Sequence, residues 1–107
     1  MITISEKDGL ITVINLFQVE GSEHQQRLVD YLVENLETPR KLPGFISANI
    51  HTSLDGTRVV NYVQWRSLEE LEAGLKRQEL QGVAKQAGDF APHDFKFYKV
   101  VFTAEAQ

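Results

Sequence analysis

Two kinds of hydrophobic pattern alternate along the chain, short runs with a period of two residues and longer runs with a helical period. The run LITVINLFQV at residues 10–19 is β-branched and apolar on both of its faces, which predicts a strand covered on both sides. Residues 45–54 and 57–65 predict two more strands, and the Asp55-Gly56 pair between them is typical of a two-residue hairpin turn. Residues 94–103 predict the last strand.

Helical patterns fill the two long gaps between these strands. Each begins with a capping box, in which a serine and a glutamine or glutamate three residues later satisfy the amide groups of a helix start. A proline is expected to end the first helix, and the second is expected to break once and to stop at a glycine. These positions are Ser22 with Gln25 and Pro39 for the first helix, and Ser67 with Glu70, Gln78 and Gly88 for the second.

The order strand, helix, strand, strand, helix, strand is the ferredoxin-like βαββαβ pattern of the α+β class. Right-handed crossovers place both helical segments on one face of a four-stranded antiparallel sheet. The opposite face then carries apolar residues that no helix covers, among them Ile14, Tyr62 and Tyr98. Because so large an apolar patch is unfavourable in water, we expect a homodimer in which two sheets face each other.

The third strand carries two residues that are unusual together on an apolar face, Asn61 and Trp65. A two-residue hairpin turn places them opposite Ile50 and Ile46. Asparagine is depleted in strands, and a buried amide is costly unless it is paired. The two residues therefore either bind a small molecule through amide and indole groups, or belong to a packed core in which the amide is satisfied. Asn15 on the first strand has the same two interpretations.

Composition narrows the classes of function. The 107 residues are expected to form a single domain over residues 1–107, with its core at about 10–103. A net charge of −4 without any Lys/Arg run argues against nucleic acid as a partner. The absence of cysteine excludes disulfides and thiolate ligands, and the three histidines lack the spacing of a metal site. No apolar run approaches the ~20 residues of a membrane span, and the first residues are not a signal peptide, so a cytoplasmic protein is expected.

The segments LPGFISANIH, SLDGT and NYVQWRS, followed by EEL, resemble the antibiotic biosynthesis monooxygenase domain over roughly residues 10–102. The resemblance implies a dimeric α+β barrel with a pocket between sheet and helices. Characterised members oxidise polycyclic phenols or anthrones to quinones with molecular oxygen, and they use neither metal nor flavin. An asparagine and a tryptophan that contact substrate and oxygen in those enzymes match Asn61 and Trp65.

Other positions depart from the pattern that the resemblance implies. Some of these enzymes have a tyrosine six residues after the tryptophan and an arginine late in the second helical stretch, where this chain has Leu71 and Lys85. The haem-degrading branch of the superfamily has an asparagine and a tryptophan that match Asn15 and Trp65. It also has a histidine where this chain has Leu75, which argues against haem.

These observations favour a cofactor-independent monooxygenase that acts on an aromatic phenol or anthrone, with oxygen as co-substrate. The alternative is a non-catalytic dimer of the same fold that binds a small ligand or has a role in the stress response. No proton acceptor is identified, since His51 is on the wetter face of the sheet and His93 is expected in a loop. The residues assigned to catalysis are Asn61 and Trp65, and those assigned to binding the aromatic ligand are Asn15, Phe17, Ile50, Leu71 and Lys85.

Overall fold

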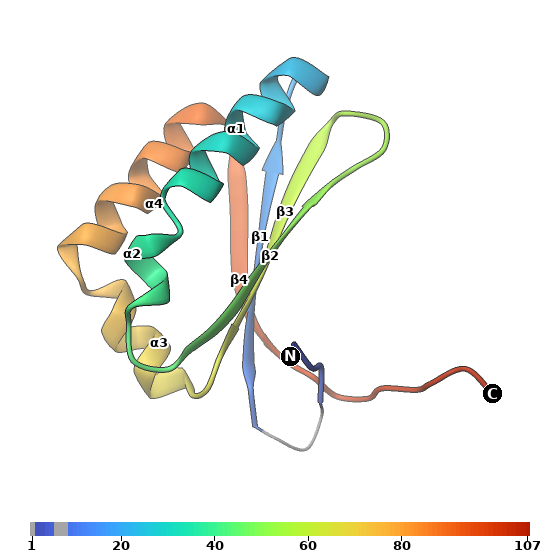
Figure 1. Cartoon of the computed structure of the whole chain (residues 1–107), viewed down its shortest axis with the longest axis vertical. Coiled ribbons are helices and arrows are strands. Elements are labelled where there is room, and N and C mark those ends of the chain that lie inside the picture. Colours follow the sequence, from blue (N-terminus) through green and yellow to red (C-terminus); the bar gives the residue numbers. More distant parts are fainter. Residues whose placement is uncertain (1, 6–8) are drawn as a thin grey trace.

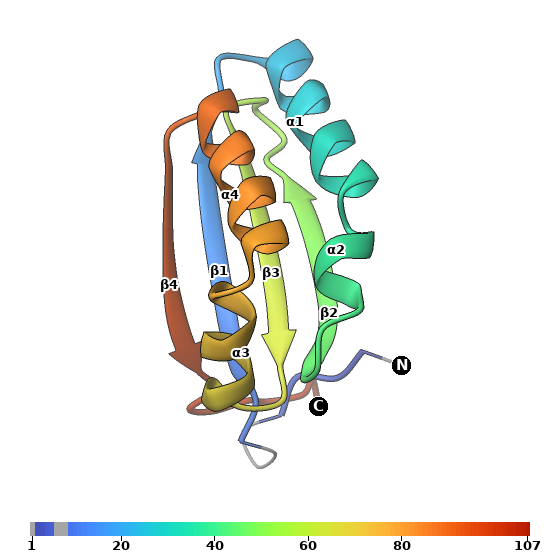
Figure 2. The same ribbon diagram turned by 90° about the vertical axis from the view of Figure 1, so that its left-hand side faces the viewer.

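Helices cover one face of an antiparallel sheet in the computed structural model, which describes residues 2–5 and 9–107 (Figure 1). Figure 2 looks onto the helix layer, with the sheet behind it. The second crossover is divided between two helices, as the expected break near Gln78 implies. In chain order the elements are β1 (Ile11–Gln18), α1 (Ser22–Glu34), α2 (Glu37–Arg40), β2 (Phe45–Thr52), β3 (Arg58–Trp65), α3 (Leu68–Leu75), α4 (Gln78–Phe90) and β4 (His93–Lys99).

The sheet has the strand order β2-β3-β1-β4, and all three pairings are antiparallel. This is the ferredoxin-like α+β arrangement predicted from the order of the elements. The register across the two central strands pairs Asn15 with Asn61, and the register of the hairpin pairs Ile50 with Asn61 as expected. Since side chains alternate between faces, these three residues share the face that meets the helices.

The pairing expected between Ile46 and Trp65 is wrong. An irregularity between Phe45 and Ser47 shifts the register at the start of β2, so Phe45 lies opposite Trp65. The two rings pack edge to face, with centroids 5.6 Å apart and an interplanar angle of 85°. Ile46 is 43% exposed as a result. A bulge adds one residue to one strand, and it cannot be read from a hydrophobic pattern alone.

The hairpin turn is longer than two residues. Ser53 and Arg58 are joined by a backbone hydrogen bond of 3.0 Å, which leaves residues 54–57 in the loop. The loop gains one residue on each side, so the register of the strands is unchanged. The Asp55 carboxylate accepts hydrogen bonds from the hydroxyl groups of Thr57 and Ser53 and from the backbone N–H of Thr57. These bonds lower the pKa of Asp55 to about 2.

Of the two expected capping serines, one caps its helix. Ser67 precedes α3, and its Oγ accepts the backbone N–H of Glu70 at 3.2 Å. Ser22, in contrast, is the first residue of α1 and makes no capping bond. The Gln25 amide instead donates to the backbone oxygens of Ser53 and Arg58, at 3.1 and 2.9 Å. Gln25 therefore fastens α1 to the β2–β3 hairpin, a contact that its place in the sequence did not indicate.

Two expected helix ends are also wrong. The helix α1 ends at Glu34, and Pro39 lies inside the short helix α2. Proline is tolerated there because it lies in the first turn of α2, where a backbone N–H would have no partner within the helix. Gly88 lies within α4, which continues to Phe90. The last strand is shorter than the expected 94–103 and starts one residue earlier, at His93.

The face of the sheet that the helices leave open is part polar and part apolar. Gln64 is 1% exposed, and its side chain accepts from the Ser47 hydroxyl and donates to the Thr3 carbonyl oxygen. Residues 2–5 and the C-terminal segment after β4 lie on this side (Figure 1). Apolar side chains here include the half-buried Ile14 and the exposed Tyr98. No helix in the described ranges is long and apolar enough to span a membrane.

Replacing Ser67 by alanine should destabilise the protein by about 1 kcal/mol, because α3 loses the acceptor for the Glu70 amide. The matched change Ser22→Ala removes no capping bond and should leave the stability close to that of the wild type. Chemical denaturation of both variants measures the difference. Equal losses in the two variants would show that Ser67 does not cap α3.

Candidate active site

A cavity of about 160 Å³ lies between the sheet and the helix layer. Its walls are mostly aliphatic and aromatic, which is the composition of sites that bind flat apolar ligands. The strands supply Val13, Asn15, Phe17, Phe45, Ala48, Asn61, Val63, Trp65, His93 and Phe95, and the helices and their connections supply Leu32, Asn35, Leu36, Pro39, Leu71, Leu75, Leu80, Val83, Ala84 and Ala87.

Asn15 and Asn61 face each other across β1 and β3 and both line the cavity. The Oδ1 atom of each is buried, and neither has a hydrogen-bond partner among the described residues. A buried amide oxygen without a partner costs roughly 1–3 kcal/mol. Two such groups side by side in an apolar cavity are therefore expensive for the fold and well placed to bind a polar group of a ligand.

Trp65 lies in the cavity wall at the end of β3, away from the two asparagines. It is 3% exposed, and its six-membered ring reaches α3, where a Cβ added to Gly74 would lie 3.0 Å from Cη2. Asn61 and Trp65 share a face but are four residues apart, which is roughly 13 Å along a strand. Val63 lies between them. A ligand that contacts both residues must extend along most of the cavity.

The structure brings together most of the residues assigned from the sequence, but not all of them. Phe17 and Leu71 line the cavity and are each 1% exposed. Ile50, although opposite Asn61, packs against the core instead of the cavity. Lys85 is exposed on α4 and is absent from the cavity wall.

His93 is a cavity residue that the sequence analysis placed in a loop. It is the first residue of β4 and lies opposite Phe17, with the two rings 5.5 Å apart. The signal was available, because the period of two that joins Phe95 and Phe97 extends back to His93. The preceding proline concealed it, since proline usually marks a loop or a strand end.

Tyr31 contacts a residue of the cavity wall, Val83, and has a structural role. Its hydroxyl donates to the backbone oxygen of Val83 at 2.9 Å, and its ring packs 5.1 Å from that of Phe90. Burial raises the pKa of Tyr31 above its usual value of 10.0. The hydroxyl therefore stays protonated at neutral pH and joins α1 to α4.

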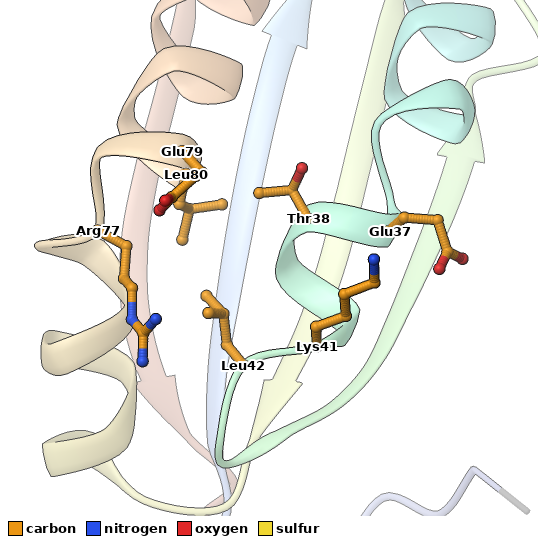
Figure 3. A pocket seen from close by; sticks show the side chains of 7 residues that line it. All are labelled: Glu37, Thr38, Lys41, Leu42, Arg77, Glu79 and Leu80. Atoms are coloured by element: carbon orange, nitrogen blue, oxygen red, sulfur yellow. The ribbon is translucent and has the colours of Figure 1, made fainter.

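A second cavity of about 290 Å³ lies between α2 and the α3–α4 connection (Figure 3). Lys41 and Arg77 line it on opposite sides, and Leu80 lines both this cleft and the inner cavity. The cleft thus places charged groups beside an apolar site. The described part of the chain contains no group of three or more His, Cys, Asp or Glu residues that could hold a metal ion.

Replacing Asn61 by leucine should stabilise the protein by about 1 kcal/mol, because it removes a buried amide oxygen that has no partner. Asn49→Leu is the matched control, since the Asn49 amide donates to Ser47 Oγ and to the Tyr62 carbonyl oxygen, and its loss should destabilise the fold. Urea denaturation compares the two variants. A loss of stability in Asn61→Leu as large as that in Asn49→Leu would show that the Asn61 amide supports the fold.

Comparison with known proteins agrees with this architecture. Tetracenomycin-F1 monooxygenase of Streptomyces glaucescens is 47% identical over 74 residues, which are 68% of this chain and 65% of that enzyme, so the match spans less than two thirds of the relative. A monooxygenase from Streptomyces coelicolor, solved with the ligand nanaomycin D, superimposes with a TM-score of 0.78 at 28% identity and covers 96% of both chains.

The cofactor-independent oxygenase SnoaB of Streptomyces nogalater has the same fold, with a TM-score of 0.78 at 16% identity over 89% of this chain and 96% of its own. Residues 10–86 match the sequence profile of antibiotic biosynthesis monooxygenases, and this segment contains the first three strands and most of the helix layer. The chain belongs to the antibiotic biosynthesis monooxygenase family.

Proposed function

We propose that this protein is a monooxygenase that oxidises a polycyclic phenol or anthrone to a quinone with molecular oxygen and without a bound cofactor. The observation that carries the proposal is the pair of buried amide oxygens of Asn15 and Asn61, which have no hydrogen-bond partner among the described residues and lie in the wall of a mostly apolar cavity. Membership of the family and the 47% identity to tetracenomycin-F1 monooxygenase support the same reaction class.

An anthrone can supply the electrons for this reaction itself. Loss of a proton from its central methylene carbon, or from the hydroxyl of its tautomer, gives one delocalised anion. Oxygen then accepts electrons from that anion, and the balanced result is a quinone and one molecule of water. The protein has to hold the anion and oxygen together in a site with little water, and to stabilise negative charge on the substrate oxygen.

The two asparagines suit both forms of such a substrate. An amide oxygen accepts a hydrogen bond from a phenolic hydroxyl, and the NH₂ group of the same side chain donates to the oxygen once it is ionised. Rotation of the terminal amide exchanges the two groups without a change of backbone. Asn15 and Asn61 would thus bind the oxygen-bearing edge of the substrate, and Trp65 would contact its far end.

The apolar walls of the cavity also suit an aromatic ligand, although the cavity encloses only part of one. At about 160 Å³ the inner cavity is smaller than the roughly 300 Å³ at which sites for drug-sized ligands begin. A substrate of several fused rings would therefore extend past the cavity, toward Leu80 and the charged cleft or toward the open edge at β4. Leu71 stands where some relatives have a tyrosine, so this part of the substrate would be bound by stacking and apolar contacts and not by a tyrosine hydroxyl.

A second candidate is a binding protein that uses the cavity without catalysis. Leu71 favours it, because this buried aliphatic residue makes no hydrogen bond to a substrate hydroxyl. Such a protein would bind an anthrone and consume no oxygen.

The proposal includes a homodimer formed by the face of the sheet that the helices leave open. Ile14, Leu16 and Val60 lie on this face and are half-buried in the single chain, and Tyr98 is 44% exposed. A second copy is the occupant whose apolar surface is complementary, since a twofold interface brings the same patch of each chain together. The polar residues around Gln64 would then lie at the rim.

Asn61→Ala and Trp65→Phe should each slow the oxidation of a model anthrone. Where one positioned donor to a developing oxyanion is lost, the cost is roughly 2.7–4 kcal/mol, or about a hundredfold in rate. Oxygen uptake by the wild type and both variants gives the rates. Circular dichroism is needed as a control, because the Trp65 ring also fills the space beside Gly74. Equal rates in folded protein would favour the binding protein.

Ile14→Glu should convert the dimer to monomers or aggregates, because it places a charge on an interface that depends on apolar contact. The matched control is Val33→Glu on α1, which is 54% exposed on the helix side and should leave the dimer intact. Sedimentation at micromolar concentration measures both. A wild-type protein that sediments as a monomer contradicts the dimer.

A further inference from the structure

Only one of the described residues that line the cavity has an ionisable side chain. Twenty residues line the cavity, all of them within the described ranges, and among them His93 alone has an ionisable side chain. Imidazole is also the side chain that takes and releases protons most readily at physiological pH. An anthrone oxidation starts with removal of a proton, so the composition of the wall restricts the choice of base to this residue or to water.

His93 is close to the two asparagines whose amide oxygens have no partner among the described residues. Across the sheet, Phe95 pairs with Asn15 and His93 pairs with Phe17, so His93 and Asn15 are diagonal neighbours on one face. Diagonal neighbours of an antiparallel pair are roughly 7–8 Å apart, and Asn61 is directly opposite Asn15. A flat ring whose oxygen meets the amides can therefore turn another edge toward the imidazole.

The other two histidines are occupied elsewhere. His24 Nδ1 accepts the backbone N–H of Glu20 at 3.1 Å, and its Nε2 is 2.7 Å from the Phe90 carbonyl oxygen. The Nδ1 atom of His51 lies 3.0 Å from the Asn49 carbonyl oxygen, on the face of the sheet away from the cavity. In contrast, no hydrogen bond engages either ring nitrogen of His93 within the described ranges.

The helix above His93 leaves space for its ring. A Cβ added to Gly88 would lie 2.8 Å from Cε1 of the imidazole, which is closer than real Cβ atoms approach, and 3.2 Å from Nδ1. Glycine inside a helix costs about 1 kcal/mol relative to alanine. The ring fits between Gly88 of α4, Phe17 of β1 and Phe95 of β4, with the Phe95 ring 6.3 Å away at an angle of 20°.

We propose that His93 is the general base of the reaction; this assignment rests on the proposed function. The neutral imidazole takes a proton from the C–H or O–H group of the anthrone, and the electron pair stays on the substrate as the delocalised anion. Oxygen accepts the electrons of that anion and bonds to the central carbon, and the imidazolium returns its proton to the outer peroxide oxygen. Loss of water then breaks the O–O bond and the remaining C–H bond and leaves a carbonyl group.

Two measurements test His93→Gln against the wild type, with His51→Gln as the matched control and 1,8-dihydroxyanthrone as the probe. Loss of a general base lowers rates by roughly 10²–10⁴-fold, so oxygen uptake should fall at least a hundredfold in His93→Gln and stay unchanged in His51→Gln. Without oxygen, the wild type should bind the probe as its coloured anion, and His93→Gln should bind it in the neutral form. Added imidazole should restore part of the rate to His93→Ala.

The outcomes separate the two proposals. Oxygen uptake by His93→Gln at the wild-type rate overturns the assignment of the base and leaves the monooxygenase intact. A folded His93→Ala that imidazole does not rescue also overturns it. If the wild type forms the bound anion and His93→Gln does not, while neither consumes oxygen, His93 is a base and the proposed oxidation is wrong.

Discussion

The site depends on the register of the two central strands. Pairing of β1 with β3 sets Asn15 opposite Asn61, and the pairing of β1 with β4 places Phe95 beside them. A slip of one residue in either strand would turn the amide of that strand to the other face of the sheet. It would also expose Phe17 of β1 or Val59 of β3, which are 1% and 0% exposed in the core. The burial of these apolar neighbours therefore fixes where the amides point.

The space between sheet and helices is divided between a filled core and a cavity. At the end of the sheet that carries Phe17 and Val59, Leu28 of α1 is completely buried and the layers are in contact. At the other end Trp65 packs against Phe45 and approaches Gly74 of α3, which holds the layers apart. The cavity lies between these two packed regions. Phe17, Phe45 and Trp65 thus stabilise the fold and line the cavity at the same time.

The sequence predicts the parts of this arrangement that follow from local pattern. Alternation gave the four strands, the order of the elements gave the topology, and the hairpin signal gave the pairing of Ile50 with Asn61. The sequence did not reveal the bulge that makes Phe45, and not Ile46, the partner of Trp65, since a bulge depends on tertiary packing. The sequence also did not show that Ile50 belongs to the core. Residues on one face of the sheet can contact either the core or the cavity, and the distance between helices and sheet decides which.

In the proposed reaction, the polar groups on the two sides of the site would have different roles. The amide oxygens of Asn15 and Asn61 are buried, in a region where a hydrogen bond to a charged oxygen is stronger than in water. His93 is exposed on an edge strand that pairs only with β1. A negative charge is best stabilised where water is excluded, whereas a proton is exchanged more easily where water has access. The sheet meets both requirements within one face, because its centre is covered by helices and its edge is open.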